Sequence, residues 1–458
     1  MQQTSTELIE THAGSATTRG SLREVAALAF PVILTQLSRT AMGVTDSVMV
    51  GRLGPVELAA VGFAGIWAWT LFCAFFGTAT GVQTFVSQAD GAGNQRECGR
   101  WVWQASYVLV PVSCVMAVLI IAGMEGLLRA LGPSAELQTS AVSYLRPRIL
   151  GAPGFVVGVV IGSFFRGFGD TRTPLYATLV ANGVNVVLDY GLIFGKLGMP
   201  DWGVAGAGIA TAIAELTYAA YLVVALHRHR ISQRYRTRVV PPDRATIARF
   251  IRTSAPIGGE WVIGMLSFAI FSTIIARMGD ASMAASQAFL ILLSLSFMQA
   301  VGVSIAAATL VGRYIGAGDL DAANRSFWSA QYMAAVLGLA VAALFIAFPG
   351  LLIRIFTNDP EVIALGRPLL MLGAGFQLFD ALGIVAGGAL RGAGDTRWPF
   401  LVHTGFAWGL FVPLAYWLGV VLEGGLWGAW VGGTAYVILL SVVFVLRFRS
   451  GAWKRLQI

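Results

Sequence analysis

Long apolar runs are the feature of this sequence that most restricts its fold. A helix needs roughly 20 apolar residues to cross a hydrocarbon core about 30 Å thick, and twelve windows of this kind occur along the 458 residues. The chain is 56% hydrophobic and only 12% charged, which leaves too little polar surface for a soluble protein of this length. We therefore predict an all-α polytopic membrane protein with twelve transmembrane helices near 25–50, 58–86, 101–124, 142–165, 174–195, 204–227, 250–277, 283–312, 326–349, 364–390, 398–420 and 427–447.

The placement of charge argues for membrane topology rather than nucleic-acid binding. The chain has 31 Lys and Arg against 23 Asp and Glu, a formal net charge of +8. These charges lie in short gaps between apolar runs, where basic residues mark the cytoplasmic side. With the N-terminus inside, 22 of the 31 basic residues fall in cytoplasmic segments. We expect both termini in the cytoplasm, no nucleic-acid partner and, because the first residues lack an apolar core, no signal peptide.

The sequence also repeats itself. RGFGDTRTP at 166–174 returns as RGAGDTRWP at 391–399, an offset of 225 residues. The same offset relates Pro31 to Pro256 and GAG at 91–93 to GAG at 316–318. Six helices return the chain to its starting side, so the halves form a parallel internal repeat, as in one class of secondary transporter.

The repeat and a basic, proline-containing gap between its halves divide the chain into five parts. We predict an N-terminal tail, an N-lobe of helices 1–6, a basic cytoplasmic linker, a C-lobe of helices 7–12 and a C-terminal tail, at 1–23, 24–227, 228–249, 250–447 and 448–458. In the repeated RG-x-GDTR-x-P segment, Asp170 and Asp395 are expected to cap the helices that follow. That segment is interpreted as structural, and no substrate is placed there.

Ionisable residues within the predicted spans are the candidate functional residues, because a charge in the bilayer is costly. Asp46 and Asp189 lie at similar depths in the N-lobe, and Asn185 shares a helical face with Asp189. Glu260 and Asp380 lie at matching depths in the C-lobe. Carboxylate and amide oxygens of this kind can bind Na⁺ or share a proton.

The remaining candidates are less specific. Glu215 lies mid-helix and either adds to the N-lobe site or pairs with Arg39. For His403, a hydrogen bond to the backbone is the simpler interpretation. Residues expected at a substrate cavity are Arg39, Glu215, Trp261, Phe289 and Phe376.

Several of these residues together resemble a known family. QLSRTAMGVTDSVMVGRLG at 36–54, the RGFGDTRTP repeat, Glu260 and Asp380 resemble the multidrug and toxic compound extrusion (MATE) family, with the NorM branch nearest, over essentially all of 24–447. The resemblance implies two six-helix lobes, a V-shaped central cleft and export of organic cations in exchange for Na⁺ or H⁺.

The resemblance also implies residue roles. Asp46 matches the acid of the family's first helix, and Glu260 and Asp380 match the NorM cation-site acids. Asn185 and Asp189 match an Asn-x-x-x-Asp motif that serves an N-lobe ion site in the DinF-like branch, and Thr211 matches a ligand in helix 6. These six residues are the predicted coupling site, and all but Thr211 are possible Na⁺ ligands.

Two departures from the family pattern affect the coupling ion. Phe376 stands where the NorM site has Tyr, and Arg39 stands where the family often has Gln. The first removes an oxygen ligand and the second can neutralise a nearby acid. We therefore favour H⁺ over Na⁺, with Na⁺ left open.

The leading functional prediction is a multidrug antiporter of the inner membrane. It would act as a monomer in contact with membrane lipid, without a cofactor, on organic cations, dyes and fluoroquinolone-like drugs. The alternative is a flippase for lipid-linked saccharides or another amphiphile. For a lipid-linked pyrophosphate its cavity should be strongly basic. A membrane enzyme is disfavoured, since the sequence offers neither HExxH nor an evident nucleophile–base pair.

Overall fold

Every regular element of the described chain is helical. The computed structural model describes residues 19–131 and 134–456. The first half contains α2 (Leu22–Gly51), α3 (Pro55–Gly91), α4 (Gln95–Leu131), α5 (Ala135–Leu150), α6 (Ala152–Gly167), α7 (Arg172–Phe194), α8 (Gly203–Leu226) and the short α9 (His229–Tyr235). The second half contains α10 (Arg244–Ala276), α11 (Asp280–Gly316), α12 (Leu320–Ala347), α13 (Pro349–Arg354), α14 (Pro360–Gly392), α15 (Arg397–Phe406), α16 (Val412–Tyr416) and α17 (Gly425–Arg449). Two π-helical segments, η1 (Ala407–Phe411) and η2 (Trp417–Val421), flank α16, and a 3₁₀ turn, η3 (Ala452–Arg455), follows α17.

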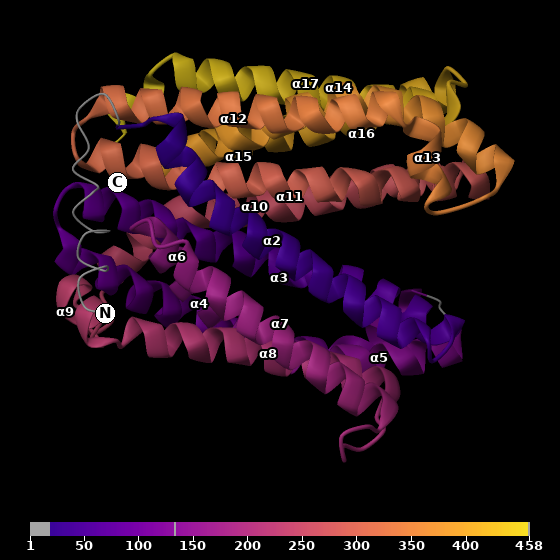
Figure 1. The fold of residues 1–458 in the computed structure, drawn as a ribbon, viewed down its shortest axis with the longest axis horizontal. Coiled ribbons are helices and arrows are strands. Elements are labelled where there is room, and N and C mark those ends of the chain that lie inside the picture. The colour runs from indigo at the N-terminus through magenta and orange to yellow at the C-terminus, as the bar shows by residue number, and fades with distance from the viewer. Residues whose placement is uncertain (1–18, 132–133, 457–458) are drawn as a thin grey trace.

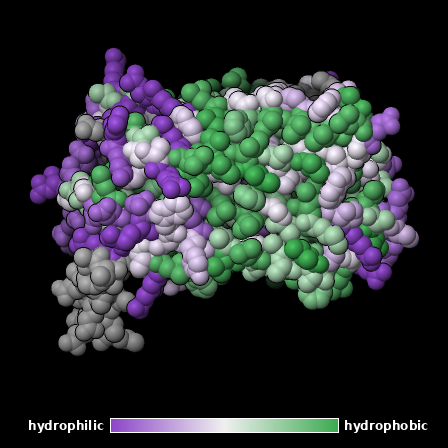
Figure 2. Space-filling model, turned by 90° about the horizontal axis from the view of Figure 1, so that it is seen from above, coloured by the Kyte–Doolittle hydropathy of each residue, from purple (hydrophilic) through white to green (hydrophobic). Residues whose placement is uncertain are grey.

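The predicted membrane spans correspond to these helices. Eleven helical segments of the described chain are long and apolar enough to cross a bilayer, and a bent pair brings the number to twelve. On the face shown in Figure 2, a broad hydrophobic band lies between two more hydrophilic ends. Side chains such as Val118, Val224 and Leu401 are about two-thirds exposed, as expected where lipid rather than water is the solvent. The protein is a multi-pass membrane protein, and the all-α prediction is confirmed.

Two of the predicted spans are less regular than a single α-helix. The window at 142–165 is a pair, α5 and α6, that meet at Gly151 with a bend of 47°. Pro153 in the first turn of α6 has no N–H to continue the hydrogen bonding of α5, and Gly151 lies against Ala212 of α8. The window at 398–420 contains both π segments, beside Pro413, where the missing N–H again disturbs the helical ladder.

The helices form two lobes, α2–α8 and α10–α17, which appear as two layers in Figure 1. Both the start of α2 and the end of α17 lie at one end of the bundle, here called the termini end. The two layers spread apart toward the opposite end, called the far end. Contacts between the lobes are made chiefly by α2 and α3 with α11, and by α3 with α10.

The contacts that join the lobes near the termini end occur at equivalent positions of the two repeats. Thr84 of α3 donates from Oγ1 to the carbonyl oxygen of Arg391 (3.0 Å), and Thr309 of α11 donates to that of Arg166 (2.9 Å). Positions 84 and 309, like 166 and 391, are 225 residues apart. The two lobes therefore exchange equivalent hydrogen bonds, which we call the reciprocal seal.

Close backbone approach follows the same symmetry. A Cβ at Gly91 would overlap the carbonyl oxygen of Arg313, and a Cβ at Gly316 would overlap that of Gln88. Residues 91 and 316 are again one repeat apart, as are 88 and 313. Only glycine permits the ends of α3 and α11 to cross so closely, which explains the repeated GAG sequence.

The linker between the lobes is hydrogen-bonded to the helix α4. Trp103, Gln104 and Tyr107 of α4 donate to the carbonyl oxygens of Thr237, Pro241 and Val240, respectively. Asp243 caps α10 and pairs with Arg100 at 2.7 Å. Hydrogen bonds from Thr246 to Asp243, together with the Arg100 charge, hold the pKa of that carboxyl below its usual value.

Candidate functional site

A well-formed cavity lies at the boundary between the lobes and is walled mainly by the C-lobe. Its volume is about 370 Å³, and it is lined by α3 of the N-lobe together with α10, α11, α14, α15 and α17. Aromatic rings make up part of its wall, among them Phe76, Trp261, Phe297 and Phe379. Trp261 packs edge-on against Trp69 and Phe76 of the N-lobe. An apolar cavity with few polar groups suits an amphipathic ligand.

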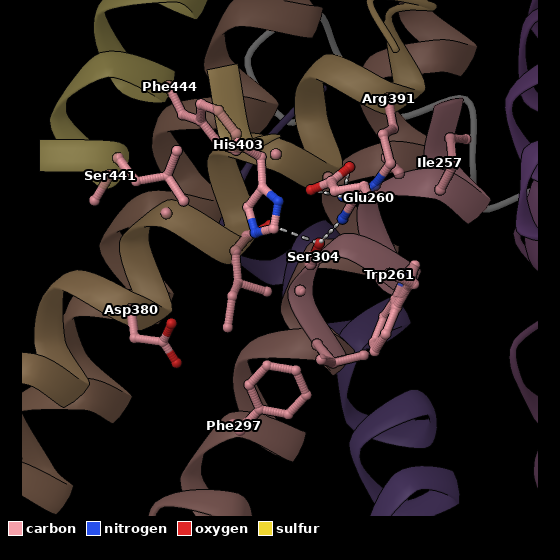
Figure 3. Close-up of a pocket in the computed structure, with 18 of the residues that line it drawn as sticks. Ile257, Glu260, Trp261, Phe297, Ser304, Asp380, Arg391, His403, Ser441 and Phe444 are labelled. Carbon is pink, nitrogen blue, oxygen red and sulfur yellow. Dashed lines mark hydrogen bonds and ion pairs between the residues drawn. The ribbon is translucent and has the colours of Figure 1, made fainter. Parts of the chain in front are cut away.

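Both predicted C-lobe acids line this cavity, but their surroundings differ. Glu260 of α10 forms an ion pair with Arg391 of α14, with both carboxylate oxygens 3.4 Å from one guanidinium nitrogen. Asp380 of α14 has no salt-bridge partner within 4.0 Å among the described residues. Figure 3 shows Asp380 and the Glu260–Arg391 pair on opposite sides of the cavity, with His403 between them. Asp380 is therefore the cavity's uncompensated carboxyl group.

Arg391 is the cavity residue that the sequence interpretation missed. Arg391 lies in the repeated RG-x-GDTR-x-P segment, which was interpreted as structural, so it was not considered as a cavity residue. A signal was nevertheless present, because Asp380, Gly387 and Arg391 are spaced by seven and four residues and so share one face of α14. All three line the cavity.

Two other expectations about polar residues also need correction. Asp170 caps α7 as predicted, accepting from the backbone N–H groups of Arg172 and Thr173. Asp395 instead pairs with Arg447 of α17 at 2.8 Å, because α17 brings a guanidinium within reach. The Nδ1 atom of His403 is buried with no hydrogen-bond partner in the described structure, so its expected backbone bond is not made there.

The predicted N-lobe site is assembled from α2, α7 and α8. Thr211 Oγ1 lies 3.1 Å from Asp46 Oδ2 and donates to it. Asn185, Asp189 and Thr211 are fully buried, and Asp46 is 4% exposed. The second oxygen of Asp46, both oxygens of Asp189 and the amide of Asn185 make no hydrogen bond within the described chain. Thr211 contacts Asp46, and Asp189 lies close enough to interact with Asp46 and Asn185. Four side chains on three helices therefore form one polar cluster, here called the N-lobe cluster.

The N-lobe cluster offers oxygen ligands of the right kind for a small cation or a proton. Buried polar atoms almost always have a partner, and a carboxylate without one carries a large desolvation cost. Carboxylate, amide and hydroxyl oxygens are ligands for hard cations. The described residues contain no group of three His, Cys, Asp or Glu side chains suited to a metal ion, so a cation here would depend on Asn185 and Thr211 as well.

The other predicted cavity residues lie elsewhere. Arg39 and Glu215 line a small separate pocket in the N-lobe, where the guanidinium of Arg39 lies over the ring of Tyr218 at 4.7 Å. No ion pair within 4.0 Å joins them in the described structure. Phe289 and Phe376 pack around Trp430 in the C-lobe core and do not line the large cavity.

Parallel six-helix repeats that bury ionisable groups between their helices are characteristic of secondary transporters, and the fold and these sites place the protein in that class. The comparisons with known proteins are more specific. The MatE family model matches residues 31–191 and 256–417, one match for each repeat. The chain belongs to the MatE family.

Curated relatives cover nearly the whole chain. A probable multidrug resistance protein NorM of Thermotoga maritima is 30% identical over 94% of this chain and 93% of its own length. The multidrug resistance protein PmpM of Pseudomonas aeruginosa is 31% identical over 93% of this chain and 91% of its own. Among solved structures, the outward-facing conformation of a multidrug resistance MATE family transporter covers 97% of this chain and 100% of its own. It has a TM-score of 0.87 at 20% identity and supports the fold.

Proposed function

We propose that the protein exports amphipathic organic cations across the bacterial inner membrane in exchange for H⁺ or Na⁺. The observation that carries the proposal is the uncompensated carboxyl of Asp380 in an aromatic cavity between two lobes. A carboxylate attracts a ligand's positive charge, and aromatic faces bind both its apolar part and the cation itself. The relatives' names describe multidrug resistance, which agrees with export of drugs.

The N-lobe cluster is proposed as the coupling site. Asp46, Asn185, Asp189 and Thr211 supply the ligands, and Glu260 and Asp380 form a second cation-responsive site in the C-lobe. Separate sites in the two lobes allow an ion and a drug to bind the same protein at different points of the cycle. The boundaries 24–227 and 250–447 are proposed for the lobes.

The proposed orientation places the termini end in the cytoplasm. Cytoplasmic segments would then hold most Lys and Arg residues, and the lobes would be joined at their cytoplasmic ends and spread toward the outside. The protein is proposed to work as a monomer embedded in lipid.

Flux experiments with reconstituted protein test the function. Proteoliposomes loaded with ethidium should move the dye uphill when a pH gradient or a Na⁺ gradient is imposed with the membrane potential clamped. The membrane potential does not distinguish H⁺ from Na⁺ as the coupling ion, since 100 mV supplies about 2.3 kcal/mol per charge for either. We expect the pH gradient to drive transport, and transport that requires Na⁺ and ignores the pH gradient would assign the coupling ion to Na⁺. Absence of dye movement under both gradients would refute the proposal.

The flippase alternative predicts a different cavity. A lipid-linked pyrophosphate needs an excess of basic groups, whereas the guanidinium of Arg391 is already paired with Glu260. Asp380 adds a further acid to the same cavity. The charge balance therefore favours a cationic substrate over an anionic one.

A further inference from the structure

Arg391 takes part in two sets of contacts, one through its side chain and one through its backbone. Its side chain lies in the cavity, 3.4 Å from the carboxylate of Glu260, and its second guanidinium nitrogen is 3.5 Å from Ser304 Oγ. The pair is largely enclosed, with exposed fractions of 22% for the Arg391 side chain and 13% for that of Glu260. The guanidinium therefore occupies the place beside Glu260 that an arriving cation would need.

The backbone of the same residue belongs to the reciprocal seal. Its carbonyl oxygen accepts the hydrogen bond from Thr84 of α3, and the next carbonyl, of Gly392, accepts from Gln88 Nε2 at 3.0 Å. Both donors are in the N-lobe. A movement of the end of α14 that repositions the Arg391 side chain would therefore act directly on the contact that holds the lobes together.

The repeat supplies an internal control for this arrangement. Arg166, one repeat earlier, makes the same kind of backbone contact, with Thr309 of the opposite lobe. Its side chain instead donates to Ser163 Oγ at 2.9 Å, and the position equivalent to Glu260 is Thr35. The seal is duplicated, but only the C-lobe arginine faces an acid among the described residues.

We propose that Arg391 is a tethered internal cation that competes with the transported cation for Glu260 and locks the seal while the site is empty. The inference deepens the proposed function and rests on it. A cation that takes the Glu260 carboxylate releases Arg391. Removing one partner of a buried ion pair leaves the other charge uncompensated, which is strongly unfavourable.

Through Arg391, cation binding at Glu260 would be coupled to the separation of the lobes at the termini end. The empty protein keeps its ion pair, and the lobes remain joined at the termini end. A bound cation breaks the pair, so the freed guanidinium favours a rearrangement of α14 that weakens the Thr84 contact. A ligand shifts an equilibrium only through different affinities for the two states, and competition with Arg391 supplies that difference. An antiporter needs such coupling, because an empty carrier that opened freely would let the gradient dissipate.

Dye binding to the purified full-length protein tests the competition. Ethidium, a monovalent cation, is titrated by fluorescence anisotropy at fixed pH and Na⁺ concentration. Arg391→Gln should bind the dye about tenfold more tightly, because Glu260 loses its competitor. Arg391→Lys keeps the charge and should stay near the wild-type affinity, and the double variant Glu260→Gln/Arg391→Gln should return close to it.

Arg166→Gln is the matched control, since it removes an equivalent arginine that faces no acid. Its dye affinity should match the wild type. An unchanged or weaker affinity in Arg391→Gln, or an equal gain in Arg166→Gln, would overturn the proposal. If the wild type binds no cationic dye, the proposed substrate class fails instead, and the second measurement still tests the lock.

The second measurement follows the lobes directly. Spin labels at Lys196→Cys and Asn358→Cys, exposed positions just beyond α7 and α13, report the separation of the lobes by pulsed electron resonance, with the exposed Cys114 replaced by Ser. Without dye, the wild type should show one long distance, and Arg391→Gln should add a shorter one as the far end closes. Identical distributions in the two proteins would refute the lock, whatever the dye experiments show.

Discussion

The two lobes have the same arrangement of helices, but their buried acidic residues have different surroundings. In the N-lobe, Asp46 and Asp189 are enclosed in the N-lobe cluster, with no salt bridge to either carboxyl among the described residues. In the C-lobe, Glu260 and Asp380 line a cavity, and one of them has an arginine partner. Duplication conserved the crossings of the helices, whereas the helix faces that carry charge diverged.

From this difference we propose different chemistry for each lobe. The N-lobe cluster is small and closed, so it suits a proton or a small ion that sheds its water. The C-lobe cavity is large, aromatic and only partly charge-compensated, which suits a bulky cation. Each prediction below tests whether that division holds.

The largest effect is expected in the N-lobe. Asp46→Asn should reduce uphill dye transport by about a hundredfold, equivalent to about 2.8 kcal/mol, because the asparagine cannot release a proton or balance a cation. Dye binding to the C-lobe cavity should remain within about twofold of the wild type, below about 0.5 kcal/mol. Transport is measured in proteoliposomes and binding by anisotropy on the same preparations.

The matched control for that variant is Glu136→Gln, which neutralises an exposed acid at the start of α5. It should transport like the wild type. A correctly folded Asp46→Asn protein that still concentrates dye against a gradient would remove Asp46 from the coupling site and break the division between the lobes.

Which features of the fold and the site could be predicted from the sequence depends on the kind of information in each sequence pattern. Apolar length predicted the spans, and the offset of 225 residues predicted the pairing of the halves, because both are properties of the chain itself. Helical depth placed Asp46 and Asp189 at one level. Depth says nothing about which way a helix is rotated, however, so Phe289 and Phe376 were expected at a cavity and lie in a packed core.

The features that the sequence did not predict arise from contacts between distant helices. The bend at Gly151 depends on close packing against Ala212 of α8, and the pairing of Asp395 depends on where α17 brings Arg447. The reciprocal seal requires the two lobes to cross at specific carbonyl groups. Each of these depends on a partner helix, although Pro153 also contributes locally to the bend at Gly151.

A smaller effect should separate the two C-lobe acids. Asp380→Asn should weaken ethidium binding about tenfold, because it removes the uncompensated carboxyl of the cavity. Glu260→Gln should instead alter how H⁺ or Na⁺ promotes dye release, since Glu260 acts through its competition with Arg391. Dye release is measured by stopped-flow fluorescence across a series of pH values and Na⁺ concentrations. Unchanged ion dependence in both variants would show that these acids are structural.

The reciprocal seal predicts effects of the same direction in the two lobes. Thr84→Val and Thr309→Val each delete the hydrogen bond to an arginine carbonyl and leave the side-chain volume nearly unchanged. Thr309→Val also deletes the hydrogen bond that Thr309 Oγ1 accepts from Gln83 Nε2 (2.9 Å). Each should shift the balance between lobe arrangements by about threefold to fivefold, as expected for a net contribution of about 1 kcal/mol per hydrogen bond. The spin-label distances described above measure the shift. A response in only one variant would show that the symmetry of the backbone does not extend to its energetics.

The smallest effect is expected where the sequence departs from its family pattern. Phe376 lies one turn before Asp380 on α14, and its ring packs on Trp430 with centroids 6.0 Å apart. Because the ring does not line the cavity, the hydroxyl of Phe376→Tyr would not reach a cation beside Asp380. We expect Na⁺-driven dye flux to change by less than about twofold, or about 0.4 kcal/mol.

Phe379→Tyr is the matched comparison, since it adds the same hydroxyl to a ring that lines the cavity and should alter dye binding more. A gain of Na⁺ dependence in Phe376→Tyr well above that limit would mean that a tyrosine here can complete an ion site in the C-lobe. The proposed division between an ion-binding N-lobe and a drug-binding C-lobe would then depend on this one side chain.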